Sequence, residues 1–195
     1  MAQAGTVTVL GGGNVTPAKK LIITGGRKFK NFVANGNFAL VNIDSDGNGI
    51  ADGWTGGGSN FVNPRVENNT QYWTPLKAAA SSSALATRDY IMTPSVYKHK
   101  FYVAFIGSNI LGLWGIQAAK VYRFSKTSGE ISAIIPATFN YGSSGKQRIV
   151  LYAHEANVES SVKNFILIDL TAEFGEGNEP DLAWCDANIP QNVIW

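Results

Sequence analysis

Short runs of alternating apolar and polar residues, each bounded by turn residues, recur along most of this chain of 195 residues. Runs that are rich in β-branched and aromatic residues and that end at Gly, Pro, Asn, Asp or Ser are typical of strands in antiparallel sheets. Their spacing predicts an all-β fold, an antiparallel β-sandwich. We expect eight strands in its body, at residues 60–66, 71–76, 84–92, 100–106, 115–124, 130–139, 147–154 and 164–170.

The alternation stops near the end of the chain, where the sequence predicts one short helix. Asn178 is a plausible N-cap for this helix, and Pro180 would lie in its first turn, where the missing N–H does no harm. Leu182, Trp184 and Cys185 would then face inward. We expect the helix to close one end of the sandwich.

The first 34 residues form an arm that differs from the body at residues 35–195. The arm contains two β-branched runs, G-T-V-T-V-L and K-K-L-I-I-T, which glycines and a proline separate. Two such short strands cannot enclose a core. They must therefore add to the sheet of the body, pair between subunits, or lie on another protein, which makes the arm a candidate anchor.

Charge divides the chain at nearly the same place. Five of the 16 basic residues and none of the 14 acidic residues precede Asp44. Such an arm can dock on an acidic partner surface or on nucleic acid, or its lysines can simply protect an exposed strand edge. Nucleic-acid binding would need basic residues interleaved with exposed aromatic rings, and K-F-K with Phe32 is a minimal version of this pattern. Five positive charges do not suffice to argue for it, and docking on an acidic protein surface explains them as well. The candidate anchor residues are Lys19, Lys20, Arg27, Lys28 and Lys30.

Composition narrows the class of protein further. Charged residues make up only 15% of the chain, whereas glycine occurs 21 times, which favours many turns between strands. Cys185 is the only cysteine, so no intrachain disulfide can form, and the first residues lack the pattern of a secretory signal. We therefore expect folding in the cytoplasm. We predict no membrane insertion, because no apolar stretch approaches the roughly 18 residues that a membrane-spanning helix needs.

The segment D-S-D-G-N-G-I-A-D-G-W, which begins at Asp44, resembles a calcium-binding loop over nine positions. Such loops place side-chain oxygens at positions 1, 3, 5 and 9, a carbonyl at position 7 and glycine at position 6, here Gly49. Position 12 is Thr55 in place of the usual glutamate, so this is not a complete EF-hand. The alternative is a plain turn that binds no ion. If a structural calcium ion is bound, removing it with a chelator should lower the melting temperature of the protein. The predicted ligands are Asp44, Asp46, Asn48, Asp52 and the carbonyl of Ile50.

Motifs that carry catalytic chemistry are scarce, and we predict that the protein is not an enzyme. The two histidines, His99 and His154, do not have metalloprotease spacing. The G-S-S-G-K segment at residues 142–146 lacks part of a phosphate-binding loop, and no G-x-S-x-G motif occurs. Two carboxylates could still meet in a cleft and cleave a glycosidic bond, because such a pair is recognised in space and not in sequence.

Two stretches resemble a known family. N-G-N-F at residues 35–38, followed by the acidic loop and a G-W pair, resembles the opening of carbohydrate-binding jelly-roll modules. F-G-E-G-N-E-P at residues 174–180 is similar to a sequence that recurs after the last strand of such modules in bacteriophage tail and other virion proteins. The resemblance covers the body and not the arm. It implies a jelly-roll β-sandwich, similar to galactose-binding and carbohydrate-binding modules, with an extended N-terminal arm and a short C-terminal helix.

The same resemblance implies a role in a bacteriophage virion. The protein would be a structural decoration or fibre component on the head or tail, assembled in the host cytoplasm. It would bind other capsid or tail proteins through the arm and associate with further copies of itself on the particle. The alternative is a carbohydrate-binding module that recognises host surface glycans. Exposed aromatic rings would then bind the sugar, and the candidates are Tyr72, Trp73 and Trp114, with Trp73 as first choice.

Overall fold

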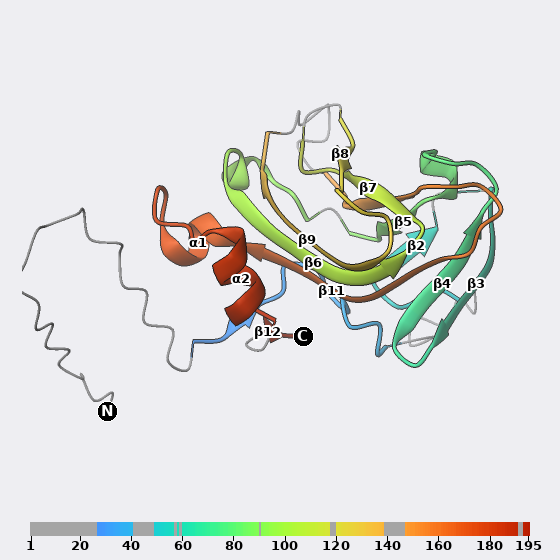
Figure 1. Ribbon diagram of the computed structural model, residues 1–195, viewed down its shortest axis with the longest axis horizontal. Coiled ribbons are helices and arrows are strands. Elements are labelled where there is room, and N and C mark those ends of the chain that lie inside the picture. Colours follow the sequence, from blue (N-terminus) through green and yellow to red (C-terminus); the bar gives the residue numbers. More distant parts are fainter. Residues whose placement is uncertain are drawn as a thin grey trace, which may run out of the picture.

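The computed structural model of the protein describes residues 27–40, 49–56, 58, 60–89, 91–117, 120–138, 147–190 and 193–195 (Figure 1). Two five-stranded antiparallel sheets pack face to face, which confirms the predicted all-β sandwich. The first sheet has the order β2 (Trp54–Gly56), β5 (Leu85–Thr87), β10 (Val150–Ala153), β7 (Ile110–Trp114) and β8 (Tyr122–Arg123). The second sheet has the order β3 (Phe61–Glu67), β4 (Thr70–Pro75), β11 (Ser160–Asp169), β6 (Lys100–Ser108) and β9 (Gly129–Pro136).

A third, smaller layer covers part of the outer face of the second sheet. It consists of α1 (Leu170–Phe174), α2 (Leu182–Asn188) and a parallel pair of two-residue strands, β1 (Phe29–Lys30) and β12 (Val193–Ile194). Figure 1 shows both helices beside β6, β9 and β11. Two 3₁₀ turns, η1 (Ser81–Ser83) and η2 (Pro94–Val96), connect strands elsewhere. Among the described residues, none of the helices is long and apolar enough to cross a membrane.

Strand β6 is buried on both faces, because a core lies on each side of it. Successive side chains of a strand point to opposite faces of its sheet. Phe101, Val103 and Phe105 accordingly enter the core between the two sheets. Tyr102 and Ala104 point the other way, into a second core beneath the outer layer. The remaining members of this second core are Phe29, Ile166, Ile168, Leu170, Cys185 and Ile189.

The last part of the predicted arm packs into the folded body. Phe29 is fully buried, and Val33 is 3% exposed. Between them, the Asn31 side chain reaches the edge of β11, where its Nδ2 donates to the Phe165 carbonyl at 2.6 Å and its Oδ1 accepts from the Leu167 N–H at 2.9 Å. Residues 29–33 therefore belong to the body in this structure, whereas residues 1–26 lie outside the described residues.

Residues 31–36 act as a partner for the second half of β11. Strand β4 pairs with β11 only as far as Lys163. Beyond that point, the Phe165 N–H donates to the Gly36 carbonyl at 2.7 Å, and the Phe32 N–H donates to the Leu167 carbonyl at 2.7 Å. Phe32 and Gly36 therefore continue the sheet along β11, and backbone hydrogen bonding explains the place of Gly36 in the N-G-N-F motif.

Several strand predictions were wrong in their bounds. The strand predicted at residues 84–92 is only β5, Leu85–Thr87, and the one predicted at residues 164–170 begins at Ser160. The sequence predicted a strand at residues 115–124, but the chain forms β7 before Gly115 and only the two-residue β8 after it. Gly115 has φ of +109°, and a Cβ at this position would collide with the Arg148 carbonyl. Because only glycine tolerates this conformation and this close approach, β7 ends there.

The C-terminal helix is confirmed, but its N-cap is not Asn178. The Asp181 side chain accepts from the Trp184 N–H at 2.9 Å and begins α2. The shorter helix α1 escaped the sequence analysis, which had extended a strand to residue 170. Its N-cap is Asp169, whose carboxylate accepts from the Ala172 N–H at 2.9 Å. A carboxylate is among the best groups for capping a helix, so both starts follow from local chemistry.

Candidate functional site

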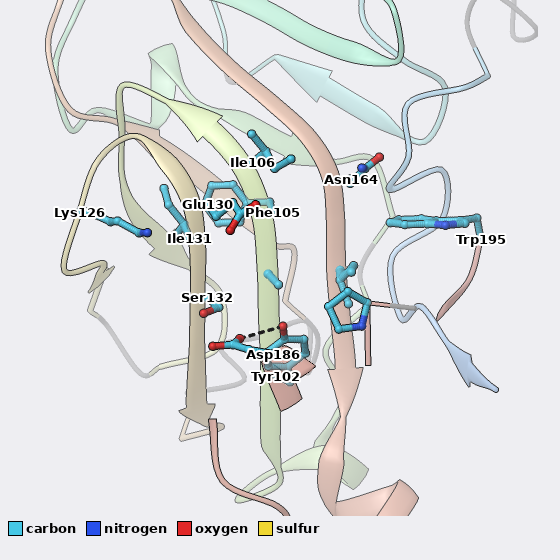
Figure 2. A pocket seen from close by; sticks show the side chains of 13 residues that line it. Tyr102, Phe105, Ile106, Lys126, Glu130, Ile131, Ser132, Asn164, Asp186 and Trp195 are labelled. Atoms are coloured by element: carbon cyan, nitrogen blue, oxygen red, sulfur yellow. Dashed lines mark hydrogen bonds between the residues drawn. The ribbon is translucent and has the colours of Figure 1, made fainter. Parts of the chain in front are cut away.

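A groove of about 430 Å³ lies on the outer face of the second sheet, next to the part that the outer layer covers (Figure 2). We call it the sheet-face groove. Strands β6, β9 and β11 form its floor, and the segments around α2 and β12 form one end and one wall. The lining residues are Tyr102, Ala104, Phe105, Ile106, Lys126, Glu130, Ile131, Ser132, Asn164, Ile166, Asp186, Pro190 and Trp195.

The ring of Trp195 forms one wall of the groove. It is 47% exposed, although it follows directly on the paired strand β12. Gly36 lies behind it: a Cβ at this glycine would lie 3.2 Å from the indole and would collide with the Phe165 carbonyl. The absence of a side chain at residue 36 therefore lets the indole lie close to the backbone that continues the sheet.

Asn164 lies on the same side of the groove as Trp195, and Figure 2 shows its side chain near the indole. The pairing of β11 with β6 shifts register between Lys163 and Ile166, and Asn164 within this bulge has φ of +51°. Bulges redirect side chains, and asparagine tolerates positive φ better than most residues. Its side-chain amide forms no hydrogen bond with any residue that the structure describes, so it is available to a ligand.

The opposite wall and one end of the groove carry charge. Lys126 and Glu130 are exposed on the β9 side, and Figure 2 shows Ser132 on the same side but closer to Asp186. At the end near α2, the Tyr102 hydroxyl donates to the Asp186 carboxylate at 3.0 Å. Burial and then the charge of Asp186 raise the pKa of Tyr102 far above its ordinary value, so the hydroxyl stays protonated and keeps donating.

The aromatic residues that the sequence analysis selected do not form a site together. Trp73 is fully buried and donates through Nε1 to the Ser83 carbonyl at 3.2 Å, so its ring cannot bind a sugar from solvent. Tyr72 is half-buried, with Arg65 4.5 Å from its ring centroid. Trp114 is half-buried on β7, in the other sheet. The sequence analysis therefore missed Trp195. Nothing in the I-W segment at residues 194–195 indicates which residues this tryptophan contacts.

The predicted calcium loop is described only in part. Asp44, Asp46 and Asn48 lie outside the described residues, whereas Ile50 is 7% exposed and packs in the main core. In the parts of the chain that the structure describes, no group of three or more His, Cys, Asp or Glu residues could hold a metal ion. The calcium site with Asp52 as a further ligand stays a prediction.

Position 6 of this loop does require glycine. Gly49 has φ of +73°, and a Cβ there would collide with the Pro64 carbonyl. The sharp turn that both a calcium loop and a plain turn need is therefore present at this residue.

The basic residues of the arm divide into two groups. Lys19 and Lys20 lie outside the described residues. Arg27 forms an ion pair with Glu173 at 2.6 Å, and its guanidinium lies 4.9 Å from the Phe174 ring centroid, so it binds its own body. Lys28 directly precedes β1, and Lys30 is its second residue. Both lysines are exposed, so they stay candidates for binding another surface.

The F-G-E-G-N-E-P segment has a clear structural role. Gly175 ends α1 with φ of +85°. The Glu179 carboxylate, with a side chain only 3% exposed, accepts from Thr171 Oγ1 at 2.8 Å and from Lys100 Nζ at 3.1 Å. Burial alone would raise the pKa of Glu179, but a backbone hydrogen bond, the two side-chain hydrogen bonds and the charge of Lys100 together lower it. Packing of α1 against β6 thus accounts for the motif, and the virion role stays a prediction.

Comparison with known proteins adds little beyond the fold. No family model and no curated protein sequence matches the chain. A solved structure described as CBM4 structure and function has 10% identity and a TM-score of 0.42, and the match covers 70% of this chain and 98% of that chain. A mutant of the family 29 carbohydrate-binding module CBM29-2, complexed with cellulohexaose, has 11% identity and a TM-score of 0.39, with 63% and 84% covered. Likenesses with TM-scores this low assign no ligand to this chain.

Proposed function

We propose that the protein is a non-catalytic glycan-binding β-sandwich whose ligand lies in the sheet-face groove. The observation that carries this proposal is the exposed ring of Trp195 beside the unbonded side-chain amide of Asn164 in an open groove. Ligand sites are typically concave and mostly apolar, with a few polar groups that fix the orientation of the ligand. The sheet-face groove has this composition.

The indole supplies the apolar contact. Trp195 is 47% exposed, whereas Trp54 and Trp73 are fully buried in the same chain. An exposed indole leaves a large rigid apolar face in water, and the C–H face of a sugar ring can cover it. Ile106, which is 45% exposed in the floor of the groove, adds apolar surface next to it.

The polar side chains supply hydrogen bonds to hydroxyl groups. Asn164 offers both donors and an acceptor, Glu130 offers acceptors, and Ser132 offers both kinds. The charged lining groups are two carboxylates, of Glu130 and Asp186, and one ammonium, of Lys126. Because the carboxylates outnumber the ammonium, an anionic sugar would be repelled, and we expect a neutral glycan.

The test is isothermal titration calorimetry, in which the full chain is titrated with a panel of neutral and acidic oligosaccharides. We expect a neutral oligosaccharide to bind, and Trp195→Ala to weaken its affinity about tenfold or more, which corresponds to about 1.4 kcal/mol. Since about half of the Trp195 side chain is exposed, the variant should retain the melting temperature of the native protein within a few degrees.

Tyr97→Ala is the matched control, because Tyr97 is also an exposed aromatic residue, 43% exposed, and does not line the groove. It should leave the affinity unchanged. The proposal fails if no oligosaccharide binds, or if Trp195→Ala binds as tightly as the native protein. Cleavage of a bound oligosaccharide would contradict the non-catalytic part.

A further inference from the structure

The two sheets differ in how well their edges are protected. Strands at the edge of a sheet can pair with another chain, and proteins prevent this with short strands, charges, prolines and bulges. The edges β2 and β8 of the first sheet have only three and two residues. Strand β3, at one edge of the second sheet, contains Pro64, the charged residues Arg65 and Glu67, and an irregularity in its pairing.

Strand β9, at the other edge of the second sheet, has none of these protections along most of its length. Its eight residues pair with β6 in unbroken register from Gly129 to Pro136. Residues 131–135, I-S-A-I-I, carry no charge. Within the part of the chain that the structure describes, β9 makes no backbone hydrogen bond beyond its ladder with β6. The N–H and C=O groups on its outer side are therefore available to another strand.

A slot of about 460 Å³ runs beside β9. Tyr122 and Phe124, whose rings meet edge to face at 5.7 Å, lie on the side of the first sheet. Leu182 of α2, which is 36% exposed, also lines the slot. A strand added to β9 would direct alternate side chains to opposite faces. One set would contact the two rings, and the other set would contact Leu182.

We propose that residues 6–10 of the same chain, T-V-T-V-L, bind in this slot as an additional antiparallel or parallel strand on β9. This segment lies outside the described residues, and the inference is independent of the proposed glycan binding. The segment alternates Thr and Val and carries no charge, which matches the uncharged stretch of β9. Its valines can cover the partly exposed ring of Tyr122 and the small exposed part of Phe124, which is 9% exposed, while its backbone pairs with the free edge.

Arg27, where the described chain begins, is held near the end of β9 that contains Ile135. Arg27 is bound to Glu173 of α1, and α1 directly follows Asp169. Asp169 pairs with Phe101, and Phe101 pairs with Ile135 of β9. Asp169 therefore lies two strand spacings, about 10 Å, from Ile135 of β9. Residues 11–26 can span roughly 50 Å when extended, so the segment can reach the slot of its own subunit.

The tether also favours the segment of the same chain over that of a second copy. A tether of at most 16 residues limits how far the segment can lie from the slot, which corresponds to an effective concentration on the order of millimolar. A second copy reaches comparable occupancy only at a similar protein concentration. Binding within one chain is therefore the arrangement that the geometry supports.

Hydrogen exchange of the full chain tests the proposal. In Val7→Pro/Val9→Pro, two N–H groups are lost and the strand cannot form. We expect those amides of residues 130–135 that point away from β6 to exchange about tenfold or more faster in this variant than in the native protein. The amides of β11, at the centre of the sheet, should be unaffected, which also shows that the body is folded.

The matched control is Asn14→Pro/Thr16→Pro, which places two prolines in the arm outside residues 6–10 and should leave β9 unchanged. Equal exchange of β9 in the native protein and in Val7→Pro/Val9→Pro would refute the proposal. Protection of β9 that increases with protein concentration would show pairing between copies, and it would overturn the assignment to the same chain.

Discussion

Trp54→Ala is expected to lower the free energy of unfolding by about 3–5 kcal/mol, the range for removing a large aromatic side chain from a core. Trp54 is fully buried where β2 begins, with its ring centroid 5.0 Å from that of Phe38 and 5.5 Å from that of Phe165. Its Nε1 also donates to the Asn35 carbonyl at 3.2 Å. Alanine would leave a cavity and a carbonyl without its donor. Urea unfolding of the native protein and the variant measures the difference.

Trp114→Ala provides the comparison, because Trp114 is only half-buried on β7. It should cost clearly less than Trp54→Ala. A loss of less than about 1 kcal/mol for Trp54→Ala would be typical of a surface substitution, and it would contradict the position of this ring in the core.

Asn31→Ala is expected to lower the free energy of unfolding by about 2–4 kcal/mol, because it removes several hydrogen bonds and leaves buried backbone groups without partners. Asn31 is 6% exposed. Its side chain bonds the Phe165 carbonyl and the Leu167 N–H of β11, and its Oδ1 also accepts from the Val33 N–H at 3.2 Å. Without it, residues 29–33 should separate from the sheet more readily. Denaturant unfolding gives the magnitude, and hydrogen exchange at β1 gives the location.

Asn37→Ala is the matched control in the same segment. Asn37 makes one side-chain hydrogen bond, in which its Oδ1 accepts from the exposed Ala39 N–H at 3.3 Å. This variant should differ from the native protein by about 0.5 kcal/mol or less. Equal effects of Asn31→Ala and Asn37→Ala would mean that the Asn31 side chain does not hold the segment to β11.

Strand positions could be predicted from the sequence because alternation is a local property. The runs at residues 60–66, 71–76, 100–106 and 130–139 became β3, β4, β6 and β9 with shifts of a few residues at most. Burial on both faces of β6 could not be predicted in this way. The residues that cover its outer face come from the beginning and the end of the described chain, and no periodicity within β6 indicates them.

The candidate site shows the same limit. Alternation has a period of two but does not say which face is inside, so the sequence could not decide between Trp73 and other rings. Trp73 proved to be fully buried, while Trp195 proved to be exposed in a groove. The positive φ of Asn164 depends on a register shift between β11 and β6, which is a property of two strands and not of either sequence segment alone.

The pairing of β1 with β12 has a consequence for biosynthesis. Phe29 lies opposite Val193, so the parallel pair joins residues from nearly opposite ends of the described chain. Contacts between such distant residues form slowly, and during translation β1 has no partner until Val193 and Ile194 have left the ribosome. The nascent sandwich would therefore expose Tyr102 and Ile166 until Cys185 and Ile189 have emerged, and Phe29 would lack its strand pairing until Val193 follows. A chaperone that shields apolar surface could bind this face in the meantime.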